Sequence, residues 1–345
     1  MTEKWSVPAA TVLRMLPAAR PLGPDAEGQW VRRWLSPEWT RMVDAWVTSR
    51  LGGPIIGEAV TYRARFWSVV RCYETAEGLV WFKENNPGHL FEAGLVSALA
   101  RLAPDAVIVP LAVDLERGWL LTADHGTTLT RADVADQRTR CLVVDALARL
   151  QNAVRGQRGA QPGMVRLAPA DAGGRVRAIA REWAGQPPGH PLRLEADELV
   201  QAEAAADVLD RTVAHLNVPL GLELNDVYAA NIFADGPRFF DFGNAIWGHP
   251  AVSLHSFLTS VVEWTEAPLS PADRDELYDV YLAVAGGRRD DLVATEVLER
   301  VHRLVAWVRL VPYADPVELR ARAGIPRSYL AGICRDPERE DRALA

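Results

Sequence analysis

Residues 222–250 read LELNDVYAANIFADGPRFFDFGNAIWGHP, and this stretch decides the fold. It holds two short runs, 232–233 and 238–240, on either side of the turn sequence Ala-Asp-Gly-Pro at 234–237. Asp-Gly between two such runs is a strong hairpin signal. The stretch therefore predicts a small antiparallel hairpin.

Three side chains with oxygen atoms flank the expected hairpin. Asp226 and Asn231 precede it and Asp241 follows it, so all three are expected at one end of a small sheet. Such a group suits Mg²⁺, which takes few carboxylates and completes its coordination with water and phosphate. Asp and Asn in turns also form hydrogen bonds to the backbone. This pattern alone therefore leaves a metal site and a purely structural turn both open.

The same residues carry a family resemblance. Asp226, then Asn231, then Asp-Phe-Gly at 241–243 resemble the catalytic loop and metal-binding motif of the protein-kinase-like superfamily. The surrounding sequence is most similar to its aminoglycoside phosphotransferase-like family, whose loop usually reads His-Gly-Asp-Leu-His-x-x-Asn. Here the loop reads LNDVYAAN, with Leu224 and Tyr228 in place of the two histidines.

Size and composition limit the alternatives. A chain of 345 residues exceeds the size at which single cores usually divide, so two lobes are expected. The net charge of −7 argues against a general nucleic-acid binder and is compatible with a cationic substrate. Three scattered cysteines indicate neither a zinc site nor a disulfide framework. With no signal-peptide pattern and no run long enough to span a membrane, we expect a cytoplasmic protein.

The first 54 residues are expected to form an extension with one helix. Residues 17–28 read as a loop. Ser36 followed by Pro37 predicts a helix start, and residues 52–54, Gly-Gly-Pro, predict its stop. Apolar residues recur there at helical spacing and predict a helix that covers the N-lobe: Trp39, Met42, Val43, Trp46 and Val47.

A small antiparallel sheet is expected next. Runs 59–65 and 68–74 read as two strands joined at 66–67, without the glycine-rich flap of most kinases. Backbone amides near Ser68 are candidates for contact with a phosphate. Run 79–83 reads as a third strand that ends in Lys83. Runs 107–113 and 119–122 complete the sheet.

Lys83 and Glu92 are a candidate ion pair. Residues 89–102 predict a helix on which Glu92 shares the apolar face. A carboxylate on such a face needs a partner, because burying a lone charge is expensive. Lys83 lies one element earlier and resembles the phosphate-binding lysine of kinases. A lysine exposed at a strand end and a glutamate solvated at the margin of its helix remain the structural alternatives.

The segment Asp124-His125-Gly126 resembles the hinge of kinases, where backbone groups contact adenine. The chain beyond it predicts mainly helices, at 142–154, 195–216, 252–262, 271–282 and 292–311. By the resemblance we expect an α+β, bilobal protein-kinase-like fold. Its expected parts are an N-terminal extension and helix at 1–54, an N-lobe with an antiparallel sheet and one helix at 55–125, and a helical C-lobe at 126–345.

The resemblance implies a role for each candidate residue. Lys83 would hold nucleotide phosphates and Glu92 would orient it, with Ser68, Asp124 and Gly126 near the nucleotide. Asn231 and Asp241 would hold Mg²⁺, and Asp226 would be the catalytic residue that accepts the proton of the substrate hydroxyl. The nucleotide is expected to be ATP, with GTP as the alternative.

The acceptor is open among three hypotheses. The first is a small molecule with a hydroxyl group, such as an aminoglycoside-like antibiotic, an amino sugar or a related metabolite. Acidic residues after the motif could bind its ammonium groups: Glu263, Glu266, Asp273, Asp275 and Glu276. The second is Ser or Thr of a natural-product precursor peptide. The third is a catalytically weak pseudokinase. No nucleic acid or membrane partner is expected.

Overall fold

A five-stranded antiparallel sheet dominates the first part of the computed structural model, which describes residues 28–157, 163–216 and 218–335. The chain divides into two compact units. Unit 1 holds the described residues up to Gly126 together with Pro312–Glu318, and unit 2 holds the rest. The expected loop at 17–27 and the last ten residues lie outside the described residues. The domain boundaries expected from the sequence stay a prediction.

The sheet of unit 1 has the strand order β1-β2-β3-β5-β4. Its strands are β1 (Ile55–Arg65), β2 (Ser68–Thr75), β3 (Gly78–Asn85), β4 (Pro110–Asp114) and β5 (Trp119–Ala123). One helix, α4 (Glu92–Leu102), lies between β3 and β4 along the chain. An antiparallel sheet with one inserted helix is the N-lobe architecture that the sequence predicts.

Two boundaries differ from the expectation. β3 continues through Glu84 and Asn85, so Lys83 lies within the strand rather than at its end. This occurs because β2 pairs with β3 as far as Ser68 opposite Asn85. The helix expected from residue 89 begins at Glu92, because a 3₁₀ turn, Pro87–His89, precedes it.

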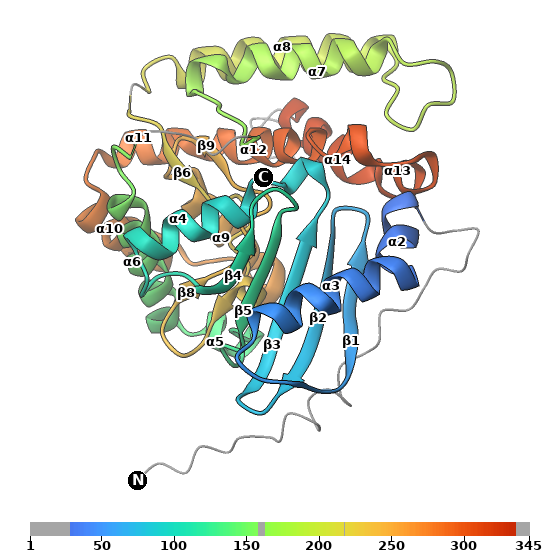
Figure 1. Cartoon of the computed structure of the whole chain (residues 1–345). Coiled ribbons are helices and arrows are strands. Elements are labelled where there is room, and N and C mark those ends of the chain that lie inside the picture. Colours follow the sequence, from blue (N-terminus) through green and yellow to red (C-terminus); the bar gives the residue numbers. More distant parts are fainter. Residues whose placement is uncertain (1–27, 158–162, 217, 336–345) are drawn as a thin grey trace. The chain divides into compact units, whose positions relative to one another are not determined.

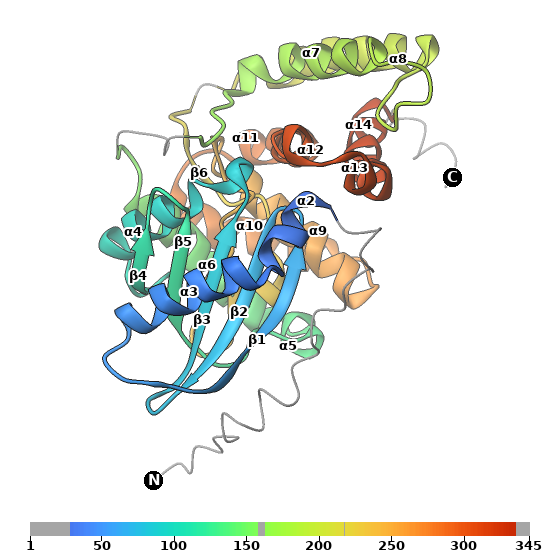
Figure 2. The same cartoon turned by 45° about the vertical axis from the view of Figure 1, so that its right-hand side comes forward.

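Helix α3 (Pro37–Arg50) lies across one face of this sheet (Figures 1 and 2). The Ser36 side chain accepts a hydrogen bond from the Trp39 N–H, which is the N-cap that the sequence predicts. Trp39, Val43 and Val47 are buried against the sheet. Met42 is 41% exposed, so the predicted apolar face is narrower than expected.

A buried carboxylate in β3 ties α3 to the sheet. Glu84 Oε2 accepts the indole N–H groups of Trp39 and Trp119, each at 2.7 Å. Arg33, from the short helix α2 (Gln29–Trp34), pairs with Glu84 Oε1 at 2.9 Å. The charge of Glu84 is therefore compensated inside an aromatic cluster, as a buried carboxylate requires.

Helices form most of unit 2. They begin with α5 (Arg131–Ala135), α6 (Gln137–Ala153), α7 (Ala172–Ala184), α8 (Ala196–Val213), α9 (Val252–Thr265) and α10 (Pro271–Ala285). After these come α11 (Arg289–Ala294), α12 (Leu298–Val308), α13 (Pro316–Arg322), whose first residues group with unit 1, and α14 (Gly324–Cys334). In α6, Val143 and Leu150 are buried, while Leu142 is 53% exposed.

Helices α7 and α8 lie side by side as a long hairpin (Figures 1 and 2). Ion pairs join the two helices, including Arg177 with Asp207 and Asp210, and Arg181 with Glu203.

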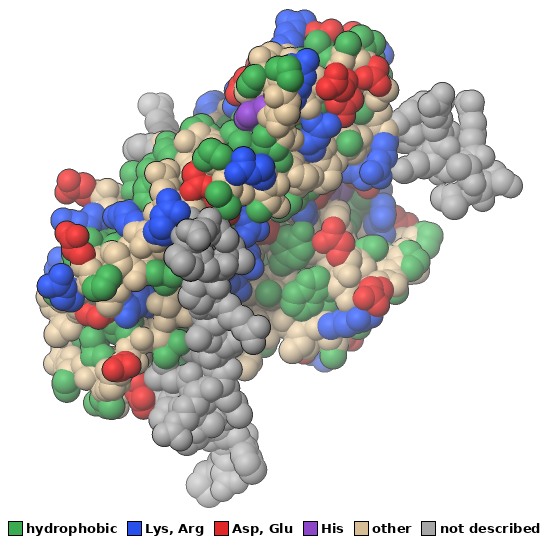
Figure 3. All heavy atoms as spheres, turned by 90° about the vertical axis from the view of Figure 1, so that its right-hand side faces the viewer, with side chains coloured by type: hydrophobic (Ala, Val, Ile, Leu, Met, Phe, Trp, Pro, Cys, Tyr) green, Lys and Arg blue, Asp and Glu red, His purple; other side chains and the backbone are tan. Residues whose placement is uncertain are grey.

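Acidic and basic side chains are interspersed over the described part of the face in Figure 3.

The helix expected over residues 292–311 is broken. It appears as α11, a 3₁₀ turn at Thr295–Val297, and α12. The Leu292 carbonyl, which a continuous helix would offer to the N–H of residue 296, accepts the Thr295 hydroxyl at 2.6 Å and lies 2.9 Å from His255 Nε2. These side chains replace the helical hydrogen bond. Among the described residues, none of the helices combines the length and apolar character needed to cross a bilayer.

Candidate active site

The hairpin predicted from Asp-Gly is present in unit 2. β7 (Ile232–Phe233) pairs with β8 (Arg238–Phe239), and Gly236 in the turn has φ of 78°. The register places Ile232 opposite Phe239, so Asn231 and Asp241 flank the same end. The Phe240 N–H donates to the Asn231 carbonyl at 3.1 Å, which extends the pairing toward that end.

Asn231 and Asp241 are the two residues that the sequence predicts to hold Mg²⁺. The Asn231 amide nitrogen donates to the Asp226 carbonyl at 3.1 Å, which directs the amide oxygen away from that carbonyl. Asp241 has φ of 62°, a left-handed conformation that reorients the chain just after β8. Within the described part of the chain, no three His, Cys, Asp or Glu residues form a metal-binding cluster. The donor set thus suits a cation with two protein oxygen ligands, not a closed protein cage.

Asp226 lies in the loop between β6 (Gly221–Glu223) and the hairpin. The Asn244 side chain, just past Asp-Phe-Gly, donates to Asp226 Oδ2 at 3.1 Å. Asn225 has φ of 64°, and the Asp226 N–H donates to the Leu224 carbonyl across it at 2.8 Å. A tight left-handed turn at Asn225 therefore presents Asp226. Leu224, in place of the usual histidine, is buried.

The other side of this loop contacts α9 and α12. Tyr228, in place of the second histidine, donates its hydroxyl to Glu263 at 3.3 Å and accepts from Arg303 Nη1 at 2.6 Å. Burial raises the pKa of the Tyr228 hydroxyl, so it stays protonated near neutral pH. The Arg303 guanidinium lies 5.4 Å from the Tyr228 ring and 6.0 Å from the Tyr329 ring. Arg303 also pairs with Glu299 at 2.5 Å.

Most of the acidic residues suggested for the acceptor already have partners on the protein. Glu266 pairs with Arg131, Asp273 with Arg140, and Asp275 with Arg289. The amide of Gln137 donates to Glu276. Four of the five carboxylates therefore already interact with other side chains of the protein. Glu263 is the member that lies against the loop carrying Asp226, through Tyr228.

In unit 1, Lys83 and Glu92 form a close ion pair. Lys83 Nζ lies 2.8 Å from Glu92 Oε1 and 2.7 Å from Oε2, and the Asn85 amide donates to Oε2 at 2.7 Å. The Glu92 side chain is only 1% exposed and that of Lys83 is 16% exposed. The alternatives of an exposed lysine and a solvated glutamate therefore do not hold. Asn85 is a further partner that the sequence analysis does not identify.

The remaining candidates of unit 1 lie at the start of a strand or just after one. Ser68 is the first residue of β2 and pairs with Arg65 and Asn85 on its two sides. The Asp124 N–H donates to the Leu79 carbonyl, and its carboxylate accepts the Trp81 indole N–H at 3.0 Å. Gly126 has φ of 86° and lies in the coil after β5.

Five further residues of the site are not indicated by any sequence motif: Glu223, Asn225, Asn244, His302 and Arg303. The signal for Glu223 was a single carboxylate in the apolar run GLEL at 221–224, because a buried charge needs partners. His302 and Arg303 similarly interrupt the apolar stripe of α12. Their partners lie up to 79 residues away along the chain, so spacing could not identify them.

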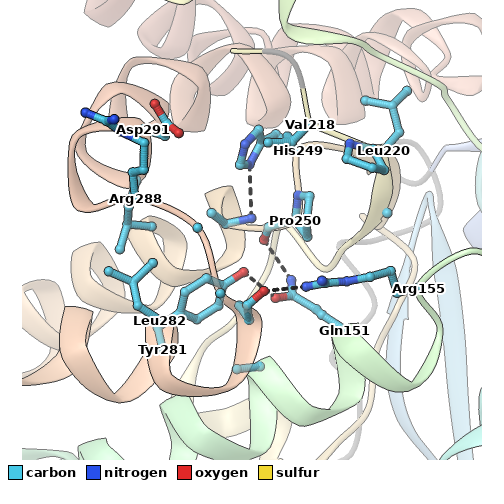
Figure 4. Close-up of a pocket in the computed structure, with 18 residues that line it drawn as sticks. Gln151, Arg155, Val218, Leu220, His249, Pro250, Tyr281, Leu282, Arg288 and Asp291 are labelled. Carbon is cyan, nitrogen blue, oxygen red and sulfur yellow. Dashed lines mark hydrogen bonds between the residues drawn. The ribbon is translucent and has the colours of Figure 1, made fainter.

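Figure 4 shows a separate pocket of about 210 Å³ in unit 2. Gln151 lies on its wall, where its amide nitrogen donates to the Leu222 and Pro250 carbonyls and its oxygen accepts the Tyr281 hydroxyl. His249 also lines it, and its Nδ1 accepts the Ala251 N–H. Gln151 therefore links the pocket wall to β6, the strand that leads into the loop carrying Asp226.

No protein-family model and no curated protein matches the chain. Solved structures do match. Choline kinase LicA from Streptococcus pneumoniae aligns with a TM-score of 0.60 and 12% identity, over 86% of this chain and 99% of that one. Amicoumacin kinase hAmiN, solved with AMP-PNP, Ca²⁺ and Ami, has a TM-score of 0.57, 12% identity and coverage of 85% and 93%.

The kanamycin and GDP complex of APH(2")-IIia gives a TM-score of 0.56 at 12% identity, over 86% of this chain and 99% of that one. All three structures belong to the aminoglycoside phosphotransferase and protein-kinase-like superfamily. The predicted resemblance is therefore confirmed at the level of the fold.

Proposed function

Because the chain has a protein-kinase-like fold, we propose that it is a small-molecule kinase. It would transfer the γ-phosphate of a nucleoside triphosphate, ATP rather than GTP in our proposal, to a hydroxyl group. The observation that carries this proposal is the catalytic loop of unit 2, where Asp226, Asn231 and Asp241 occur together at one end of the β7–β8 hairpin. The Lys83–Glu92 ion pair of unit 1 supports it independently.

Unit 1 supplies residues for the nucleotide. Lys83 binds phosphate oxygens, and Glu92 fixes the direction of the ammonium group because its own carboxylate is buried and held by Asn85. Ser68 at the start of β2, and the segment Asp124 to Gly126, offer backbone groups to the nucleotide.

Unit 2 supplies the metal ligands and the residue that handles the proton. Asn231 and Asp241 would hold Mg²⁺, which when bound would neutralise charge on the phosphates. Asp226 accepts the proton of the acceptor hydroxyl, a role worth roughly 10²–10⁴-fold in rate. Asn244 restrains the carboxylate of Asp226 by the hydrogen bond to Oδ2.

For the acceptor we propose a small molecule that binds beside Tyr228 and Glu263. Choline kinases and antibiotic kinases among the similar structures support a small-molecule acceptor. Glu263 is exposed and can accept a hydrogen bond from a hydroxyl or ammonium group. The faces of Tyr228 and Tyr329 already lie near the guanidinium of Arg303. This pair is therefore a poor site for a further cation.

Thermal shift is the first test. We would heat the wild type and Asp241→Ala with Mg-ATP, Mg-GTP and each nucleotide without metal. At a hundred times the dissociation constant, binding stabilises the fold by about 2.7 kcal/mol, or a few degrees. We expect a magnesium-dependent shift that Asp241→Ala loses. The absence of a shift with any nucleotide would contradict the proposal.

Acceptors are then screened by the gain in mass of one phosphate. We expect Asp226→Ala to keep the nucleotide shift and to lose transfer by roughly 10²-fold or more. Full transfer by this variant would show that Asp226 is not the catalytic residue.

A further inference from the structure

Glu223 is a completely buried carboxylate, one residue before the loop that carries Leu224, Asn225 and Asp226. Both of its oxygens are engaged. Oε1 accepts the Asn225 N–H at 2.6 Å and lies 3.3 Å from the Ser253 hydroxyl, which donates to it. Oε2 lies 3.1 Å from His302 Nδ1. A carboxylate is expensive to bury unless its partners are well placed. Glu223 therefore depends on Asn225, Ser253 and His302 keeping their positions.

His302 contacts the loop by two routes. Its imidazole bonds to Glu223, and its main-chain carbonyl accepts the Asn225 amide at 3.1 Å. Strand β9 (Ile246–Gly248) leaves room for the ring, because a Cβ at Gly248 would lie 2.8 Å from His302 Cε1. The backbone N–H and the side chain of Asn225 are therefore both held by the Glu223–His302 pair.

Support of this turn matters, because a φ of 64° is a sparsely populated conformation for a non-glycine residue, although Asn adopts it more readily than most. The Ser256 hydroxyl also holds the turn, by donating to the Asn225 carbonyl at 2.7 Å. The turn sets the direction in which the next residue, Asp226, leaves the backbone. A shift of about 1 Å in such a group can cost roughly 10²-fold in rate.

We propose that Glu223 and His302 are positioning residues, which hold the turn at Asn225 and so present Asp226. Glu223 acts from the end of β6 and His302 acts from α12. The side chain of Leu224, the loop residue before Asn225, is apolar and cannot form such hydrogen bonds. The expected effect on catalysis rests on the proposed function. The support of the turn at Asn225 by Glu223 and His302 does not depend on it.

The test compares His302→Leu with His302→Asn. Leucine removes the imidazole, whereas the asparagine amide can place a donor close to the position of Nδ1 and should rescue the contact. His255→Leu is the matched control, because His255 is also buried in unit 2 but bonds to Leu292 and Thr295. Glu223→Gln is the second probe if His302→Leu does not fold.

Hydrogen–deuterium exchange of residues 221–231 is the readout that needs no activity. We expect His302→Leu to exchange at least 10-fold faster in this segment, with His302→Asn close to the wild type and His255→Leu unchanged there. Glu223→Gln should exchange faster in the same segment. Unchanged exchange in His302→Leu and Glu223→Gln would overturn the proposal, and so would equal acceleration throughout unit 2.

Hydrolysis of Mg-ATP by water tests the catalytic part without a known acceptor. We expect kcat to fall 10- to 100-fold in His302→Leu, with less than a threefold change in KM and recovery in His302→Asn. A rise in KM alone would contradict a positioning role. If the wild type neither binds nor hydrolyses nucleotide, the proposed function fails, while the exchange result still decides whether the pair supports the turn.

Discussion

Glu92 is a residue whose environment leaves little freedom. Its carboxylate is 1% exposed and contacts the ammonium of Lys83 and the amide of Asn85. Removing one member of a buried ion pair leaves the other charge poorly compensated, which costs more than the pair itself contributes. The native pair therefore acts mainly to hold Lys83 in one place.

We predict that Glu92→Gln lowers the free energy of unfolding by about 1–3 kcal/mol and weakens the thermal shift with Mg-ATP. Chemical denaturation and the nucleotide shift measure the two effects. Glu77→Gln is the control, because Glu77 lies exposed in the turn before β3 and should change neither. Wild-type behaviour of Glu92→Gln would mean that Lys83 does not depend on this carboxylate.

Local patterns were enough to predict some residue contacts and not others. Lys83 and Glu92 are nine residues apart, on consecutive elements. A carboxylate on an apolar helix face needs a partner, and Lys83 was the nearby lysine, so the pair could be predicted. Glu223 and His302 are joined only by tertiary packing across 79 residues. Residue type could show that each needs a partner, but the partner depends on how α12 packs.

At the level of elements, the contact between α7 and α8 depends on one small residue. A Cβ at Gly173 would lie 2.6 Å from the Ala206 carbonyl and 2.1 Å from the carboxylate of Asp210. The Gly173 N–H also donates to Asp210 at 3.1 Å. By contrast, a Cβ at the neighbouring Gly174 would meet nothing within 4 Å.

This difference gives a matched pair of variants. We predict that Gly173→Ala destabilises the protein by about 1–3 kcal/mol, because the helices must move apart. Gly174→Ala should stabilise it by about 0.4–1 kcal/mol, since alanine restricts the unfolded chain and favours the helix. Thermal unfolding of both variants checks the signs. Stabilisation by both changes would show that backbone preference, not packing, governs this contact.

The predictability of an element followed the strength of its local signals. Ser36-Pro37 predicted α3 and Asp-Gly predicted the β7–β8 hairpin, because caps and turns are encoded in a few adjacent residues. The sequence analysis assigned no element to the glycine-containing helix α7. It also missed the break after α11, which depends on His255, a residue from a different helix.

For the whole molecule, the fold was predicted from the order of several weak motifs, and the solved structures confirm it at 12% identity. Order along the chain survives when individual residues change. The acceptor site stays a prediction. Three of its expected acidic residues, Glu266, Asp273 and Asp275, pair with arginines from other helices, and the sequence did not indicate these partners.

Stability against acid is a property of the whole chain that buried histidines should control. Burial lowers the pKa of His249 to about 4, and the nearby His302 and His255 add to this effect. Burial also lowers the pKa of His255. The unfolded chain, in which histidine has a pKa of about 6.5, therefore binds more protons than the native state between pH 6.5 and 4. The contribution of His249 to the free energy of unfolding is complete above pH 6.5 and is lost as the pH falls toward 4.

We predict that this one group destabilises the protein by about 2 kcal/mol between pH 8 and pH 5. Glu299 acts in the opposite sense, because burial raises its pKa, so a single-site comparison is needed. His249→Asn keeps an acceptor for the Ala251 N–H but cannot take up a proton, and its unfolding midpoint should fall less on acidification. Equal slopes in the wild type and His249→Asn would show that the acid sensitivity arises elsewhere.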